Sequence, residues 1–183
     1  MIARGDMGVE IPFKMLPAIQ KKLITKCRLL GKRVITATEM LESMISNPRP
    51  TRAEISDVAN AVYDGTSAIM LSGETAAGKY PLEALKTMAE IAETTENNIH
   101  YNKRFYNAEF KIRNSVDAIS HSTCGMAIDL NAKAIVACSL SGMTARMVSR
   151  FRPSVPILGL TTEERTWRRL ALSWGVIPAM CER

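Results

Sequence analysis

The sequence has few of the residues from which metal centres and disulfide frameworks are built. Its 183 residues include four cysteines and two histidines. No two cysteines form a CxxC pair, and the histidines lie apart in the sequence. This pattern fits no zinc template and no disulfide-rich fold. A structural zinc site, a disulfide scaffold and a histidine-based catalytic triad are therefore disfavoured.

The surroundings of two cysteines predict buried thiols. Cys124 lies in a helical pattern and Cys138 lies in the apolar stretch AIVAC. An unpaired cysteine in such a place behaves as a small apolar residue. Because unpaired cysteines are typical of compartments that keep thiols reduced, the sequence predicts a cytoplasmic protein.

Long apolar runs and aromatic residues are scarce as well. No stretch approaches the roughly 20 apolar residues of a membrane-spanning helix, so no membrane partner is expected. The formal net charge of +6 is compatible with nucleic-acid binding, but aromatic residues make up only 5% of the chain. Basic residues are also interspersed with acidic ones. The sequence therefore favours a solvated basic surface over a nucleic-acid partner.

Strand and helix patterns alternate along the first hundred residues. The predicted strands are 2–3, 33–38 and 67–72, and the helices that follow them are 12–30, 51–65 and 81–99. Thr51-x-x-Glu54 is a capping box that opens the second helix. This alternation implies a parallel sheet, and the spacing suits eight β/α units in about 250 residues. Spacing alone does not separate a barrel from an open doubly wound sheet.

The alternation restarts after a charged, aromatic stretch at 104–114, which is predicted to be a linker or an irregular end to the preceding long helix. Beyond it, helices are predicted at 116–130, 144–151 and 162–174, and strands at 134–139, 156–160 and 175–180. Thr161-x-x-Glu164 is a second predicted capping box. This tighter alternation suits a small open α/β domain.

Polar residues follow each predicted strand of the first half. In parallel α/β sheets the functional groups gather at the carboxyl ends of the strands. These positions hold Gly5 and Asp6, then Thr38 and Glu39, then Ser72, Gly73 and Glu74. Arg4, Gly5 and Asp6 are predicted to form a loop in which Asp6 is a candidate magnesium ligand. The alternative is a tight glycine turn in which Asp6 caps the following helix.

The stretch GETAAGKY at 73–80 nearly matches the phosphate-binding pattern GxxxxGK[ST]. Its last position is Tyr80, which does not place a small hydroxyl on magnesium as serine or threonine does. Glu74 would also place a negative charge inside the phosphate cradle. A nucleotide-binding P-loop is therefore rejected.

The stretch SLSGMTA at 139–145 joins a predicted strand to a predicted helix. Its hydroxyl groups, its glycine and the helix N-terminus favour a phosphate cradle made by Ser139, Ser141, Gly142 and Thr144. The alternative is a serine-rich helix N-cap.

Four long segments resemble one known family. IARGDMGVEIP, KRVITATEMLESMISNPRPTRAEISDVANAVYDG and AIMLSGETAAGKYPLEA resemble consecutive segments of pyruvate kinases, and SLSGMTARMVSRFRPSVPILGLT resembles their C-terminal domain. The resemblance implies about strands 6–8 of a (β/α)8 TIM barrel, followed by a partial open α/β three-layer domain. The implied divisions are 1–103, a linker at 104–114, and 115–183. It further implies that the sequence starts at the sixth barrel strand and ends partway through the last domain.

The resemblance implies a reaction and roles for several residues. The reaction is phosphoryl transfer between phosphoenolpyruvate and ADP in glycolysis, which gives pyruvate and ATP and requires Mg²⁺ (or Mn²⁺) and K⁺. Asp6 matches the metal-binding aspartate, and Gly5 and Asp6 match the turn whose N–H groups face the substrate. Thr38 matches the threonine that hydrogen-bonds the substrate, and Ser72 matches a candidate proton relay. Arg4 is expected to order the loop that contains Gly5 and Asp6.

The same resemblance implies that much of the enzyme is missing from this sequence. The family's catalytic lysine, its second metal carboxylate, its potassium ligands, its nucleotide-binding arginines and its lid domain are absent. Many relatives also have a lysine where this chain has Ala77. The chain alone is therefore expected to be inactive. The family implies a homotetramer and a sugar-phosphate or nucleotide effector at SLSGMTA. The alternative hypothesis is a non-catalytic α/β module that binds phosphorylated metabolites.

Overall fold

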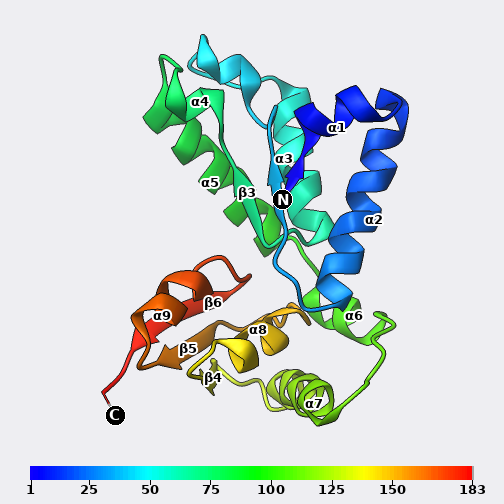
Figure 1. Ribbon diagram of the computed structural model, residues 1–183, viewed down its shortest axis with the longest axis vertical. Coiled ribbons are helices and arrows are strands. Elements are labelled where there is room, and N and C mark those ends of the chain that lie inside the picture. The colour runs from blue at the N-terminus through cyan, green and yellow to red at the C-terminus, as the bar shows by residue number, and fades with distance from the viewer. Residues whose placement is uncertain (183) are drawn as a thin grey trace. The chain divides into compact units, whose positions relative to one another are not determined.

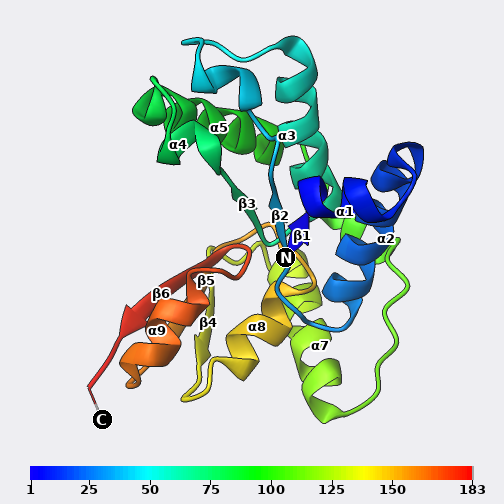
Figure 2. The same cartoon turned by 45° about the horizontal axis from the view of Figure 1, so that its top comes forward.

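The structure is a computed structural model that describes residues 1–182. The chain forms two compact units, each with one parallel sheet (Figures 1 and 2). The first unit contains Met1–Lys26 and Val34–Ile99, and the second contains Cys27–Arg33 and the chain from His100 onwards.

The first sheet has three short parallel strands in chain order. They are β1 (Ile2–Ala3), β2 (Ile35–Ala37) and β3 (Ala68–Met70). The register pairs Ala3 with Ala37 and Ala37 with Met70, so all three strands end at the same edge. Each strand lies within its predicted range. This sequential parallel order is the one expected of part of a (β/α)8 barrel.

Each strand of the first unit is followed by a predicted helix. These helices are α2 (Leu16–Leu29), α3 (Arg52–Asp64) and α5 (Pro81–Asn97). Four shorter segments also turn helically: α1 (Arg4–Glu10), η1 (Phe13–Met15), η2 (Glu42–Ile45) and α4 (Gly73–Ala76). A buried core joins α3 and α5 to the segment after β2 through Leu41, Val58 and Met88.

The capping box that the sequence predicts at Thr51 is confirmed. The Thr51 hydroxyl accepts a hydrogen bond from the Glu54 N–H, and the Glu54 carboxylate accepts one from the Thr51 N–H at 2.7 Å. The same carboxylate accepts hydrogen bonds from the Ser43 N–H at 2.7 Å and the Ser43 hydroxyl at 2.6 Å. Glu54 therefore fixes both the start of α3 and the η2 turn.

The second unit contains a second three-stranded parallel sheet in chain order. Its strands are β4 (Ile135–Cys138), β5 (Ile157–Thr161) and β6 (Val176–Met180), and its helices are α6 (Tyr101–Tyr106), α7 (Ser115–Asp129), α8 (Met143–Ser149) and α9 (Glu164–Leu170). The predicted linker thus contains part of α6. Phe105 in that helix is 3% exposed and belongs to the core of this unit.

Helices α8 and α9 of the second unit pack against the same face of its sheet. A Cβ added to Gly159 in β5 would lie 3.0 Å from Leu170 of α9 and 3.6 Å from Ala145 of α8, so both helices approach the same face. On the opposite face, Val136 of β4 and Ile177 of β6 are exposed. Residues 100–182 therefore supply two layers of the expected three-layer domain.

The predicted loop at Arg4–Asp6 is wrong, because these residues form the first turn of α1. Asp6 lies inside that turn and, within residues 1–182, its side chain makes no hydrogen bond, so the capping alternative is also wrong. Glycine disfavours helix, but the Gly5 N–H is held from outside the helix by the Thr38 hydroxyl. Tertiary contacts thus override local propensity here.

Two further sequence predictions are corrected in the second unit. Thr161 is not the N-cap of α9: it ends β5, and Glu163 occupies the cap position without a capping side chain. Cys124 is buried as predicted, but Cys138 is exposed. Cys138 lies on the same alternating face of β4 as Val136, which the described helices leave uncovered.

Over residues 1–182, no helix is both long enough and apolar enough to span a lipid bilayer.

The four hydrogen bonds at Glu54 predict a pH-dependent stability. Partial burial by itself raises the pKa of Glu54, but the hydrogen bonds from Ser43 and Thr51 outweigh it and lower the pKa below its ordinary value of 4.5. A lowered folded-state pKa stabilises the fold above the unfolded-state pKa, and this stabilisation is lost as the pH falls through the folded-state value. Glu54→Gln should cost about 1–2 kcal/mol near neutral pH.

This loss should shrink between about pH 5 and pH 3, because the parent's Glu54 is protonated there. Urea unfolding followed by circular dichroism across that range measures it. The matched control is Glu90→Gln, which removes an exposed carboxylate from α5. A cost for Glu54→Gln that is independent of pH, or a cost equal to that of the control, would contradict the assignment.

Candidate functional site

The ends of β1, β2 and β3 bring three polar segments to one edge of the first sheet. Because the last residues of the strands lie side by side, the segments that follow them start at the same edge. The Gly5 N–H donates to the Thr38 hydroxyl at 2.9 Å. Gly5 and Thr38, which are 33 positions apart in the sequence, are therefore in direct contact.

Arg4 is the residue that ties these segments together. It is 6% exposed. Its Nε and Nη2 donate to the Thr38 carbonyl at 3.0 and 2.6 Å, and Nη2 also donates to the Glu39 carbonyl at 2.8 Å. Its Nη1 forms an ion pair with Asp57 of α3. One guanidinium thus joins the end of β1, the turn after β2 and the third helix.

The turn after β2 has an unusual backbone. Thr38 and Glu39 have φ angles of 69° and 54°, in the left-handed region that residues with a Cβ rarely adopt. Such residues cost of order 1–3 kcal/mol each and persist only where their surroundings hold them. The bonds from Arg4 to both carbonyls hold this turn. The result is a Thr38 hydroxyl fixed between the Gly5 N–H and the Ala37 carbonyl.

A buried carboxylate shapes the segment after β3. Glu74 is fully buried, and it accepts hydrogen bonds from the Leu41 N–H at 3.0 Å and the Ser72 N–H at 2.7 Å. Its position after a strand was visible in the sequence, but its role as a link to Leu41 was not. The Ser72 hydroxyl oxygen is buried and, within residues 1–182, has no hydrogen-bond partner.

Asp6 is exposed at this edge, in the first turn of α1. Among the described residues, no group of three or more His, Cys, Asp or Glu side chains could hold a metal ion. Magnesium in phosphoryl-transfer sites typically uses one or two carboxylates together with water and substrate oxygens. A single exposed carboxylate fits that kind of coordination, provided that the other ligands come from outside this chain.

The SLSGMTA stretch of the second unit joins β4 to α8. Gly142, with φ of +74°, occupies the N-cap position of α8, so the alternative of a serine N-cap is wrong. The Ser141 hydroxyl accepts a long hydrogen bond of 3.4 Å from the Met143 N–H. Ser141 and Thr144 are exposed and Ser139 is half-buried. Ser141 and Thr144 are therefore accessible, and they lie in the other unit from Asp6 and Thr38.

The Arg4 contacts predict the effect of a conservative change. Arg4→Lys keeps the charge that faces Asp57 but replaces the planar fork that reaches two carbonyls. The chain should lose at least about 2 kcal/mol of stability, and the amide resonance of Gly5 should move because the Thr38 turn relaxes. Urea unfolding and ¹⁵N NMR measure the two effects. Arg52→Lys, at an exposed position of α3, is the matched control. An Arg4→Lys chain with unchanged stability and an unmoved Gly5 resonance would refute the role of Arg4.

Two family models match most of the chain. Residues 1–85 match "Pyruvate kinase, barrel domain", and residues 117–183 match "Pyruvate kinase, alpha/beta domain". Relatives named pyruvate kinase include one from Clostridium acetobutylicum, which is 55% identical over 100% of this chain and 39% of its own length. Another, from Geobacillus stearothermophilus, is 54% identical over 96% of this chain and 30% of its own length.

A solved structure of a pyruvate kinase also matches this chain. The crystal structure of a pyruvate kinase from Cryptosporidium parvum matches with a TM-score of 0.94 and 42% identity, over 98% of this chain and 37% of its own. The chain thus spans well under half the length of these relatives. Both matched domains, the identities and the shared fold lead to one conclusion: the chain belongs to the pyruvate kinase family.

Proposed function

We propose that this chain forms part of an enzyme that transfers a phosphoryl group between phosphoenolpyruvate and ADP, giving pyruvate and ATP in glycolysis. The observation that carries the proposal is the contact between Gly5 and Thr38 at the sheet edge where Asp6 is exposed. This edge is where catalytic groups gather in (β/α)8 barrels. The family membership supplies the reaction and the candidate residues, and the geometry of this edge supports their proposed roles.

Asp6 is the residue that would hold the Mg²⁺ (or Mn²⁺) ion. A divalent ion bound there supplies positive charge that offsets the charge on the transferring phosphoryl group. The Asp6 N–H lies in the first turn of α1, where backbone N–H groups have no intrahelical acceptor. This N–H is proposed to face the substrate carboxylate. We assign no K⁺ ligand to this chain.

Thr38 is proposed to bind the substrate through its hydroxyl. In the structure this hydroxyl donates to the Ala37 carbonyl at 2.6 Å and accepts from the Gly5 N–H. Rotation of the hydroxyl hydrogen would redirect the donor towards a substrate oxygen while the Gly5 N–H still holds the oxygen in place. Gly5 thus contributes by positioning Thr38 as well as by its own place in the substrate-facing turn.

Ser72 is proposed to serve as a proton relay at the mouth of the barrel. The support is its buried hydroxyl, which lacks a hydrogen-bond partner within residues 1–182, together with the Glu74 carboxylate that holds its N–H. A buried hydroxyl without a hydrogen-bond partner destabilises the fold unless another group or molecule bonds to it. A substrate or a water molecule in the site would satisfy it.

The remaining parts of the proposal concern the complete protein. Its domain division in this stretch is proposed as 1–103, a linker at 104–114, and 115–183. We propose a cytoplasmic protein, which the four unpaired cysteines support. The homotetramer that we also propose rests on family membership alone. Regulation by a sugar phosphate or a nucleotide is proposed at Ser139, Ser141, Gly142 and Thr144, and the exposed positions of Ser141 and Thr144 support it. Ala77 stands where many relatives have a lysine, so a nucleotide contact made by that lysine would have to come from other residues.

A chimera tests the catalytic roles. In it, this chain replaces the matching segment of the Clostridium acetobutylicum relative, with which it is 55% identical. The chimera should release pyruvate from phosphoenolpyruvate and ADP in the presence of Mg²⁺ and K⁺, whereas the isolated chain should release none. Asp6→Asn or Thr38→Val in the chimera should each reduce kcat/KM by about 10² to 10³. Ser122→Ala, at an exposed position of α7, is the control.

An active chimera in which neither Asp6→Asn nor Thr38→Val reduces kcat/KM would refute the assigned roles. Pyruvate release by the purified isolated chain would refute its predicted inactivity.

The second candidate function is binding of a phosphorylated metabolite without catalysis. The exposed hydroxyls of Ser141 and Thr144 favour it. Calorimetric titration of the isolated chain with fructose 1,6-bisphosphate should then show saturable binding that the change of both residues to alanine removes. A flat titration would count against it, and so would binding that survives the double change.

A further inference from the structure

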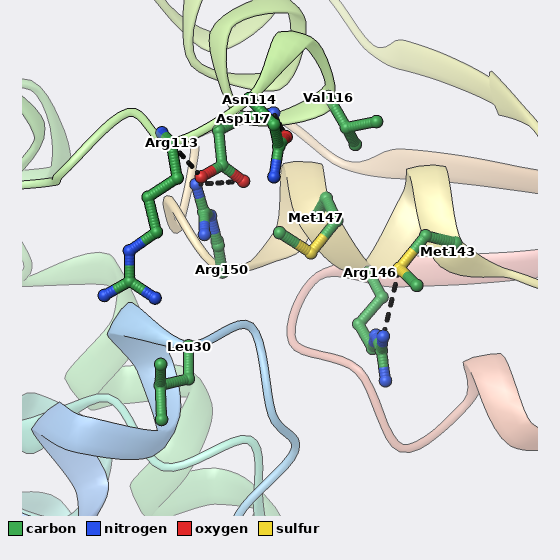
Figure 3. Close-up of a pocket in the computed structure, with 9 residues that line it drawn as sticks. All are labelled: Leu30, Arg113, Asn114, Val116, Asp117, Met143, Arg146, Met147 and Arg150. Atoms are coloured by element: carbon green, nitrogen blue, oxygen red, sulfur yellow. Dashed lines mark hydrogen bonds and ion pairs between the residues drawn. The ribbon is translucent and has the colours of Figure 1, made fainter.

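A pocket of about 290 Å³ opens in the second unit, beside the start of α7 and along α8 (Figure 3). Its size is close to the lower end, about 300 Å³, of the range for small-molecule sites. Three of the residues that line it are arginines: Arg113, Arg146 and Arg150. Neither the catalytic proposal nor the SLSGMTA proposal uses these arginines.

The negative charge in the pocket is already paired. Asp117 is the only acidic residue in the lining. Its Oδ1 forms an ion pair of 3.0 Å with Arg150, and its Oδ2 accepts a hydrogen bond of 3.2 Å from the Arg113 backbone N–H. Asp117 and Arg150 are 3% and 5% exposed, so this pair is buried. The guanidinium groups of Arg113 and Arg146 therefore remain as an excess of two positive charges.

The polar groups left over in the pocket are donors. Within residues 1–182, the Arg113 guanidinium has no hydrogen-bond or ion-pair partner, and that of Arg146 contacts only the Met143 sulfur, at 3.0 Å. The Nε atoms of Arg146 and Arg150 are buried and likewise lack a hydrogen-bond partner. The Asn114 carbonyl is taken by the Asp117 N–H, which leaves its NH₂ group. The pocket therefore offers hydrogen-bond donors that have no acceptor within residues 1–182.

The rest of the wall is apolar and firmly placed. Leu30, Val116 and Met147 line it alongside the arginines. A Cβ on Gly31 would lie 2.7 Å from the Met147 sulfur, so the segment after α2 packs closely on α8. The Arg150 Nη1 also donates to the Leu29 carbonyl at 3.3 Å. The pocket thus combines donors with an apolar wall.

We propose that this pocket binds a small organic phosphate. Its phosphate group is held by Arg113 and Arg146, and its carbon skeleton packs on Leu30 and Met147. Two surplus guanidinium groups match the charge of a phosphate monoester, and arginine forks donate to phosphate oxygens in pairs. The apolar wall favours a phosphate with a compact apolar body over inorganic phosphate. The site differs from the Ser141 and Thr144 hydroxyls, and it does not depend on the catalytic proposal.

Titration of this chain with phenyl phosphate tests the proposal, with ¹³C-methyl methionine NMR as the readout. The Met143 and Met147 methyl resonances should shift saturably, while those of Met40 and Met44 in the first unit stay in place. Inorganic phosphate and phenol, which each supply half of the ligand, should bind at least tenfold more weakly. Arg113→Ala combined with Arg146→Ala should weaken phenyl phosphate binding at least tenfold, because both phosphate donors are lost.

The matched control removes two exposed arginines of α9, Arg165→Ala with Arg168→Ala, and should leave the affinity unchanged. Circular dichroism checks that all variants are folded. The proposal is overturned if Met143 and Met147 do not respond at millimolar ligand, or if both double variants weaken binding equally. It is also overturned if Ser141→Ala with Thr144→Ala abolishes binding while the Arg113 and Arg146 variant retains it, since the phosphate would then lie at that loop.

Discussion

The arrangement of the first unit depends on one buried guanidinium. Arg4 reaches from the end of β1 to the carbonyls of Thr38 and Glu39 and to the Asp57 carboxylate. A buried charge is tolerated only where partners replace its lost hydration, and here two carbonyls and one carboxylate do so. These partners also hold two residues in the left-handed region. The position of the Thr38 hydroxyl is thus a consequence of the Arg4 contacts.

Two carboxylates, one buried and one partly buried, serve the same purpose in the neighbouring loops. Glu74 links the segment after β3 to the Leu41 N–H, and Glu54 links the start of α3 to Ser43. Glu74 bonds to a residue 33 positions away and Glu54 to one 11 positions away, and such charge-assisted bonds are stronger than neutral ones. The loops at the carboxyl ends of three short strands are therefore cross-linked by charged side chains. A site on these loops is preorganised before any substrate binds.

The sequence predicts the elements well and the tertiary contacts poorly. Apolar periodicity is local, so the three barrel strands, their helices and the Thr51 capping box were all predictable. The Thr161 capping box failed because Thr161 still pairs with Met180 in the sheet. Cys138 was misjudged because a uniformly apolar strand does not show which face a second layer covers. The α1 helix and the links made by Arg4 and Glu74 depend on residues more than thirty positions away.

We propose that Gly5, Asp6 and Thr38 form one side of a phosphoryl-transfer site. The most direct measurement is a crystal structure of the chimera described above with Mn²⁺ and phosphoenolpyruvate. We expect anomalous density for Mn²⁺ coordinated by Asp6, with a substrate oxygen hydrogen-bonded to the Thr38 hydroxyl, which the Gly5 N–H still holds. A metal and substrate bound without contact to Asp6 or Thr38 would contradict it.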